Sequence, residues 1–190
     1  MRQPTSDSVF ERVVIEACSY LQDIGFRISE RCPTLVRYVH QEVEVDFYQG
    51  RQSFEVSVGV SINAVRFSLS ELIRLGDPKM ADAFRNPVAT DTDGVESAVF
   101  QVAFLLRQFG ALALRGDASV LAALTTQRQQ WSDTFALDVL VEQTRPMADR
   151  AFKAGNYSKA VELYTRIQAR LSPAEKGKLA LSEERSATRH

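Results

Sequence analysis

Residues 36–60 read VRYVHQEVEVDFYQGRQSFEVSVGV, and apolar residues alternate there with polar ones at a period of two. Successive side chains of a β-strand point to opposite faces, so this period predicts strands with one buried and one solvated face. The apolar positions of the clearest run are Val43, Val45 and Phe47, and its acidic positions are Glu42, Glu44 and Asp46. The sequence thus predicts a sheet with one apolar face and one acidic face.

Short polar turns connect this run to its neighbours. His40-Gln41 forms one turn, and residues 49–52 form another. Connections this short force neighbouring strands to run antiparallel. Segments rich in β-branched and aromatic residues predict a meander of four or five strands, over residues 27–30, 35–40, 43–48, 54–60 and 65–69.

Helix-start signals lie on both sides of the predicted strands. A serine or aspartate precedes a glutamate by three positions in three capping boxes, Ser8/Glu11, Ser68/Glu71 and Asp93/Glu96. These signals predict helices over residues 8–24, from Ser68 through Leu75, and a strongly apolar one that includes Val95. Elements of like kind lie together along the chain, which predicts an α+β fold with helices covering one face of an antiparallel sheet.

The C-terminal part is expected to be helical throughout. A helix from Ala118 places Leu121, Leu124, Trp131 and Phe135 on one face, and Pro146 is expected to break it. We therefore predict an α+β domain over residues 1–144. Residues 145–190 are expected to form a helical hairpin and a short terminal helix packed on that domain.

Residues 148–180 read ADRAFKAGNYSKAVELYTRIQARLSPAEKGKLA. Small and aromatic residues recur there at Ala148, Phe152, Gly155, Tyr157, Ala160, Tyr164 and Ile167. This pattern resembles a single tetratricopeptide unit over residues 146–180, with the expected proline one residue late at Pro173. The resemblance implies a helical hairpin of the kind found mostly in proteins that bind other proteins. The alternative is a hairpin that only closes the chain's own core.

Two stretches of the first part, VRYVHQEVEVDFYQGRQSFEVSVGV and FSLSELIRL, carry a second, looser resemblance. They are similar to small uncharacterised bacterial α+β proteins of immunity type. That resemblance implies an immunity or accessory protein that binds another protein, and it transfers no catalytic residues.

Composition fits an ordinary cytoplasmic domain. The chain has 190 residues and a net charge of −1. Its apolar runs are far shorter than a membrane span, and its first residues do not read as a secretory signal. Cys18 and Cys32 match no zinc spacing and are expected to stay reduced.

Two surfaces are candidates for binding a partner. The first is the acidic sheet face, formed by Glu42, Glu44 and Asp46 with Glu55 across the hairpin. A cationic partner would bind such a face, although antiparallel sheets often carry solvated charges without any partner. The second is the C-terminal hairpin, where Lys153 and Lys159 are the candidate residues.

Catalysis has little support in the sequence. His40 is the only histidine before the C-terminal residue, and Glu42 and Cys32 are its candidate partners for nucleophilic chemistry. The sequence lacks a glycine-rich phosphate loop and recognisable metal-ligand spacing, so we expect neither cofactor nor metal. Nucleic acid is not an expected partner, because its electrostatic footprint needs basic residues clustered on one face as well as positive charge.

Three hypotheses remain. The first is a non-enzymatic protein-binding module with an immunity, accessory or scaffold role. The second is a small enzyme or ligand-binding domain with a pocket between the sheet and the helix that includes Val95. The third is a homo-oligomer in which an apolar edge of the hairpin pairs with another copy.

Overall fold

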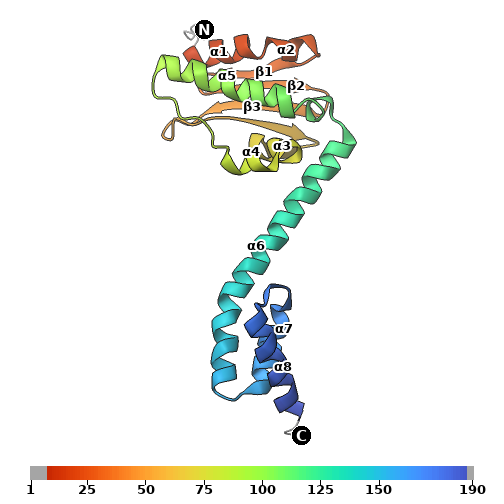
Figure 1. Cartoon of the computed structure of the whole chain (residues 1–190). Helices are drawn as coiled ribbons and strands as arrows, with labels where there is room; N and C mark the ends of the chain where they lie inside the picture. The colour runs from red at the N-terminus through yellow and green to blue at the C-terminus, as the bar shows by residue number, and fades with distance from the viewer. Residues whose placement is uncertain (1–7, 188–190) are drawn as a thin grey trace. The chain divides into compact units, whose positions relative to one another are not determined.

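The computed structural model describes residues 8–187, and Figure 1 shows its helices and strands. The strands are β1 Arg27–Cys32, β2 Leu35–His40, β3 Val43–Gln49, β4 Val56–Ile62 and β5 Val65–Ser68. The α-helices are α1 Val9–Ala17, α2 Ser19–Asp23, α3 Leu69–Gly76, α4 Pro78–Ala83, α5 Thr92–Phe109, α6 Ala118–Lys153, α7 Tyr157–Arg166 and α8 Pro173–Ala187. Two 3₁₀ turns, Ala113–Arg115 and Gln168–Arg170, lie between helices. The fold is α+β, as the sequence predicts.

The chain packs as two compact units, Met1–Thr126 and Gln127–His190. Helix α6 belongs to both, because it begins in the first unit and ends in the second. The division expected between residues 144 and 145 falls inside this helix.

The sheet is the predicted antiparallel meander, with its five strands in the order β1-β2-β3-β4-β5. Val45 in the central strand β3 lies opposite Tyr38 on one side and Val60 on the other. All three are completely buried, so this row belongs to the apolar face. The neighbouring row, which contains Asp46, points to the opposite face of the sheet.

Helices cover the apolar face. Figure 1 shows α5 lying across the sheet beside α1. Val99, Val102 and Leu106 of α5 are completely buried in the same cluster as the inner residues of the sheet. The apolar residues that alternate in the strands therefore pack in one core with those that recur every three to four residues in α5.

The predicted helix starts are largely confirmed. Ser8 and Glu11 form the capping box of α1, and Ser68 and Glu71 form that of α3. The chain over residues 8–24 nevertheless forms two helices, with Cys18 between them.

The predicted capping box at Asp93 is wrong. Asp91 caps α5, because its carboxylate accepts the backbone N–H of Gly94 at 2.8 Å. A Cβ at Gly94 would lie 3.1 Å from the same carboxylate oxygen, so the cap packs closely against this residue. Asp93 lies in the first turn, where its charge still favours the helix.

Pro146 does not end the helix that starts at Ala118. Proline removes one backbone hydrogen bond and crowds the preceding turn, which disfavours a helix interior. Here Thr144 and Ala148 on either side of it are buried. Arg145 also donates a hydrogen bond from Nη2 to the carbonyl oxygen of Arg170 at 3.0 Å. Tertiary packing therefore overrides the local preference, and α6 continues to Lys153.

The second unit is a three-helix arrangement. The last part of α6, α7 and α8 lie side by side (Figure 1) around a small core. Gly155 takes the left-handed conformation, with φ of 71°, at the turn between α6 and α7. Ser172 and Glu175 form a capping box before α8. The helical hairpin predicted from residues 146–180 is thus present, with its first helix continuous with the rest of α6.

Candidate functional site

The outer face of the sheet carries charges of both signs. Register places Glu30, Arg37 and Asp46 side by side on β1, β2 and β3. Arg37 donates from Nε to Asp46 Oδ1 at 2.6 Å and from Nη1 to Glu30 Oε2 at 2.7 Å. Asp46 is only 9% exposed, and its hydrogen bond is the main cause that raises the pKa of Arg37. An arginine therefore occupies the centre of the face predicted to be acidic.

A second arginine approaches Asp46 from β5. Arg66 Nε lies 3.6 Å from Asp46 Oδ2. Its guanidinium lies over Gly59, where a Cβ would come within 2.5 Å of it. Glu44 also lies 3.7 Å from Arg37 Nε. The chain's own arginines thus neutralise much of this face, and this weakens its electrostatic attraction for a cationic partner.

The other two predicted acidic residues lie away from this cluster. Glu42 is exposed in the turn between β2 and β3, at the Val43 end of the β3–β4 ladder. Glu55 lies beyond the opposite end of that ladder, where it forms a bridge with Val88. The structure therefore brings Glu44 and Asp46 together but leaves Glu42 and Glu55 apart.

Lys153 and Lys159 lie on either side of the turn between α6 and α7. Lys153 is exposed in the last turn of α6, four residues before Tyr157 of α7. Lys159 donates from Nζ to Glu162 Oε2 at 2.7 Å. Both side chains reach solvent, and their role in binding stays a prediction.

Cys32 and His40 are placed too far apart for a shared reaction. Cys32 pairs with Leu35 at the start of β2, whereas His40 ends that strand. Five residues of strand separate these positions by roughly 16 Å. The two residues also belong to opposite faces of the sheet, and His40 Nδ1 lies 2.9 Å from the carbonyl oxygen of Gly25.

The space between the sheet and α5 is occupied by side chains. Val99, Val102 and Leu106 pack there with inner residues of the sheet, and all three are completely buried. Among residues 8–187, no group of three or more His, Cys, Asp or Glu side chains could hold a metal ion. Within the same residues, no helix is long and apolar enough to cross a bilayer.

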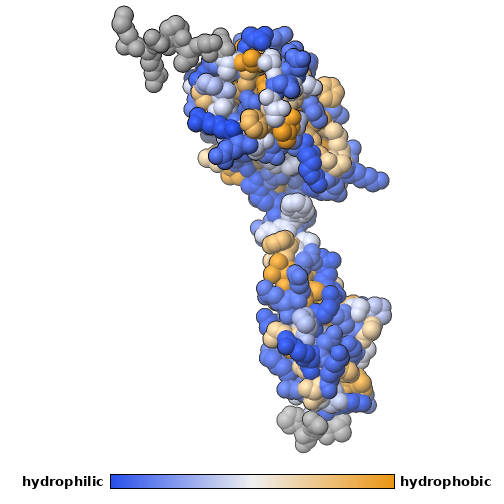
Figure 2. Space-filling view, turned by 90° about the vertical axis from the view of Figure 1, so that its left-hand side faces the viewer, coloured by the Kyte–Doolittle hydropathy of each residue, from blue (hydrophilic) through white to orange (hydrophobic). Residues whose placement is uncertain are grey.

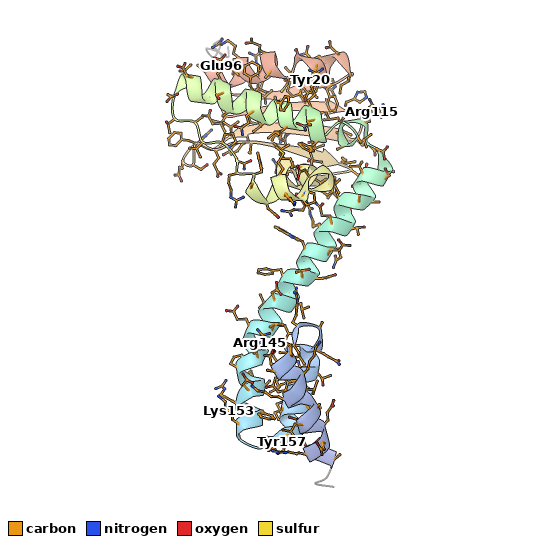
Figure 3. The ribbon with its side chains drawn as sticks, viewed as in Figure 1. Tyr20, Glu96, Arg115, Arg145, Lys153 and Tyr157 are labelled. Atoms are coloured by element: carbon orange, nitrogen blue, oxygen red, sulfur yellow. The ribbon has the colours of Figure 1, made fainter. Side chains whose placement is uncertain are left out.

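A polar network holds the second unit together. Asp149 of α6 accepts hydrogen bonds from Tyr164 Oη and Lys178 Nζ, both at 2.6 Å. These two bonds lower the pKa of Asp149, and the bond from Lys178 has the larger effect. Arg145, labelled in Figure 3, donates from Nε to Glu175 Oε1 at 2.6 Å. All three helices of the unit are therefore linked by charged contacts.

Helix α6 exposes an apolar stripe in the second unit. Trp131 is 67% exposed, Phe135 72% and Val139 37%. They recur every four residues and so lie on one face of the helix. We call these three side chains the Trp131 face. By contrast, Figure 2 shows a visible surface that is mainly hydrophilic, with smaller hydrophobic areas between.

The shared helix face of Trp131 and Phe135 is evident in the sequence, but their exposure is not. The period places them with Leu121 and Leu124, and Leu124 is completely buried in the core of the first unit. A continuous apolar stripe normally indicates a continuous buried face. Here the sequence between Leu124 and Trp131 is polar, as at Gln129 and Gln130. This polarity is the signal that the middle of α6 packs against no hydrophobic core.

No family model, curated protein or solved structure matches the chain. The resemblance of residues 146–180 to a tetratricopeptide unit therefore rests on the positions of its small and aromatic residues alone.

Proposed function

We propose that this chain is a non-enzymatic protein-binding module and that the Trp131 face is its docking surface. The observation that carries the proposal is the exposure of Trp131 and Phe135, at 67% and 72%, on neighbouring turns of one helix. Large aromatic side chains grouped on a surface are typical of protein–protein interfaces. Tryptophan is also among the residues that contribute most to binding when a partner buries it.

The surrounding sequence supports the same proposal. Residues 125–136 read TTQRQQWSDTFA and contain many residues of weak helix propensity. Nearly all of them are exposed, so packing within the chain contributes little to this part of α6. A helix in this situation gains stability when its apolar face is covered. A partner would therefore bind a helix that is already formed and would stabilise it further.

The role proposed for such a module is that of an accessory or scaffold protein in the cytoplasm. Cys18 and Cys32 are both free thiols, which is typical of a reducing compartment. The immunity role implied by the looser resemblance is a special case of the same proposal, in which the bound protein is one that must be neutralised.

Affinity purification from the native cells tests the proposal. The tagged chain should retain a stoichiometric protein partner, which can be the chain itself. Trp131→Ala combined with Phe135→Ala should lose that partner. The matched control is Phe104→Ala, because Phe104 is 66% exposed but lies on α5 in the first unit. Retention by the double variant, with folding unchanged, would place the docking surface elsewhere.

A further inference from the structure

We propose that the occupant of the Trp131 face is a second copy of this chain, paired antiparallel about a two-fold axis at Phe135. This inference rests on the proposed function, because it names the partner of the same surface. It follows from three features of α6: the side of the helix on which the face lies, the charges at the two ends of the face, and their spacing from Phe135.

The face lies opposite the side of α6 that packs in the second unit. Leu137 and Leu140 pack against the core of that unit, and Val141 and Ala148 are buried in it. An α-helix turns about 100° per residue, so these side chains lie on the far side of the helix from Trp131 and Phe135. Helices α7 and α8 therefore leave the Trp131 face open to another helix.

A charged residue of opposite sign lies at each end of the face. Arg128 precedes Phe135 by seven positions and Glu142 follows it by seven. Seven residues are close to two turns, so both charges lie on the same side of α6 as Phe135. Both side chains are exposed. The face thus has a positive N-terminal end, an aromatic centre and a negative C-terminal end.

This order of charges selects the antiparallel arrangement. A two-fold axis at Phe135 places Phe135 against its own copy and Trp131 against Val139 of the second copy. It also places Arg128 against Glu142 of the second copy, and does so twice by symmetry. A parallel pair would bring Arg128 against Arg128 and Glu142 against Glu142, and such like-charge contacts disfavour pairing.

The pairing uses one helix face of each copy, from Arg128 to Glu142. Such an interface lies at the small end of those that proteins use, where complexes are weak or transient. We therefore expect a dimer with a dissociation constant on the order of micromolar, so that both monomer and dimer occur at accessible concentrations.

Sedimentation velocity of the full-length chain over a range of concentrations tests the pairing. The wild-type chain should shift from monomer to dimer as its concentration rises. Trp131→Ala should weaken the association at least tenfold, and Phe135→Ala should do the same. Phe104→Ala should leave it unchanged. Circular dichroism serves to check that each variant keeps its helix content.

Charge reversal tests the orientation of the pair. Arg128→Glu alone should weaken association, because it faces Glu142 of the second copy, and Glu142→Arg alone should do so for the corresponding reason. The two changes combined should restore association close to the wild-type level. A combined variant that pairs no better than either single variant would overturn the antiparallel arrangement.

The two levels of the proposal fail in different ways. A wild-type chain that stays monomeric at the highest concentration, yet binds a different protein through Trp131, overturns self-pairing and leaves the binding function intact. Dimers that form equally well with Trp131→Ala overturn self-pairing through this face. A chain that neither self-associates nor loses any partner when Trp131 and Phe135 are changed overturns both.

Discussion

The outer face of the sheet and the Trp131 face are both exposed, but the first carries paired charges and the second carries large apolar side chains. On the sheet, Arg37 and Arg66 lie beside Glu30, Glu44 and Asp46, and the charges are paired within the chain. On α6, Trp131 and Phe135 are more than two-thirds exposed. Solvated ion pairs form an ordinary protein surface, whereas grouped exposed aromatic side chains are typical of a surface that binds.

This difference changes which surface is the better candidate for function. Residues 42–46 suggest an acidic binding surface when the sequence is considered alone. The arginines that neutralise this surface lie on other strands and are not part of that stretch. The aromatic stripe does not suggest a binding surface in the same way, because such a stripe normally enters a core. The sequence therefore favours the acidic surface for binding. The register of the sheet and the exposure of α6 make the Trp131 face the better candidate.

The largest expected effect is the difference in stability between alanine variants of two phenylalanines, Phe47 and Phe135. Phe47 is completely buried in the sheet, so Phe47→Ala should lower the free energy of unfolding by about 3–5 kcal/mol. Phe135→Ala should change it by no more than about 0.5 kcal/mol when the protein is dilute enough to be monomeric. Urea unfolding measures both. A large loss for Phe135→Ala under these conditions would show that its side chain is buried within the chain.

An intermediate effect should come from the charged cluster of the sheet. Asp46→Asn keeps the shape of the side chain but removes the charge beside Arg37 and Arg66, so the free energy of unfolding should fall by about 1–2 kcal/mol. Glu42→Gln is the matched control, because Glu42 is exposed in a turn, and it should have no measurable effect. Equal effects of the two changes would contradict the pairing described for this face.

A smaller effect should appear in the second unit at acid pH. The hydrogen bonds from Lys178 and Tyr164 hold the pKa of Asp149 below its value in the unfolded chain, which is about 3.9. Asp149 therefore stabilises the fold above that pH, and this contribution is lost as the pH falls through the lower folded value. Asp149→Asn should remove this pH dependence, whereas Asp133→Asn should keep it. Urea unfolding from neutral pH down to about pH 3 compares the three chains.

Much of the first unit could be predicted from the sequence because local signals there agree. Alternation marked β2 to β4, and the short turns implied the antiparallel order that the structure shows. The sequence predicts the wrong start for α5, because Asp91 and Asp93 both lie at capping distance before the helix. The structure uses Asp91, whose carboxylate accepts the backbone N–H of Gly94, so α5 begins two residues earlier than predicted.

The candidate surfaces were harder to predict because they depend on contacts between distant residues. Arg37 and Arg66 become neighbours of Asp46 only when the four strands β2 to β5 are in register. Pro146 was expected to end a helix, but the buried residues around it keep α6 continuous. Neither a strand register nor the packing around a proline can be read from a window of a few residues.

Intrinsic fluorescence tests the central claim most directly, because Trp131 is the only tryptophan of the chain. The emission of the wild-type protein should be that of a solvent-exposed indole in dilute solution. It should move to shorter wavelength as the concentration rises and a second copy covers the Trp131 face. The double reversal Arg128→Glu with Glu142→Arg should show the same shift, and either single reversal should show it only at higher concentration. Emission that stays at one wavelength over the whole range would contradict the account.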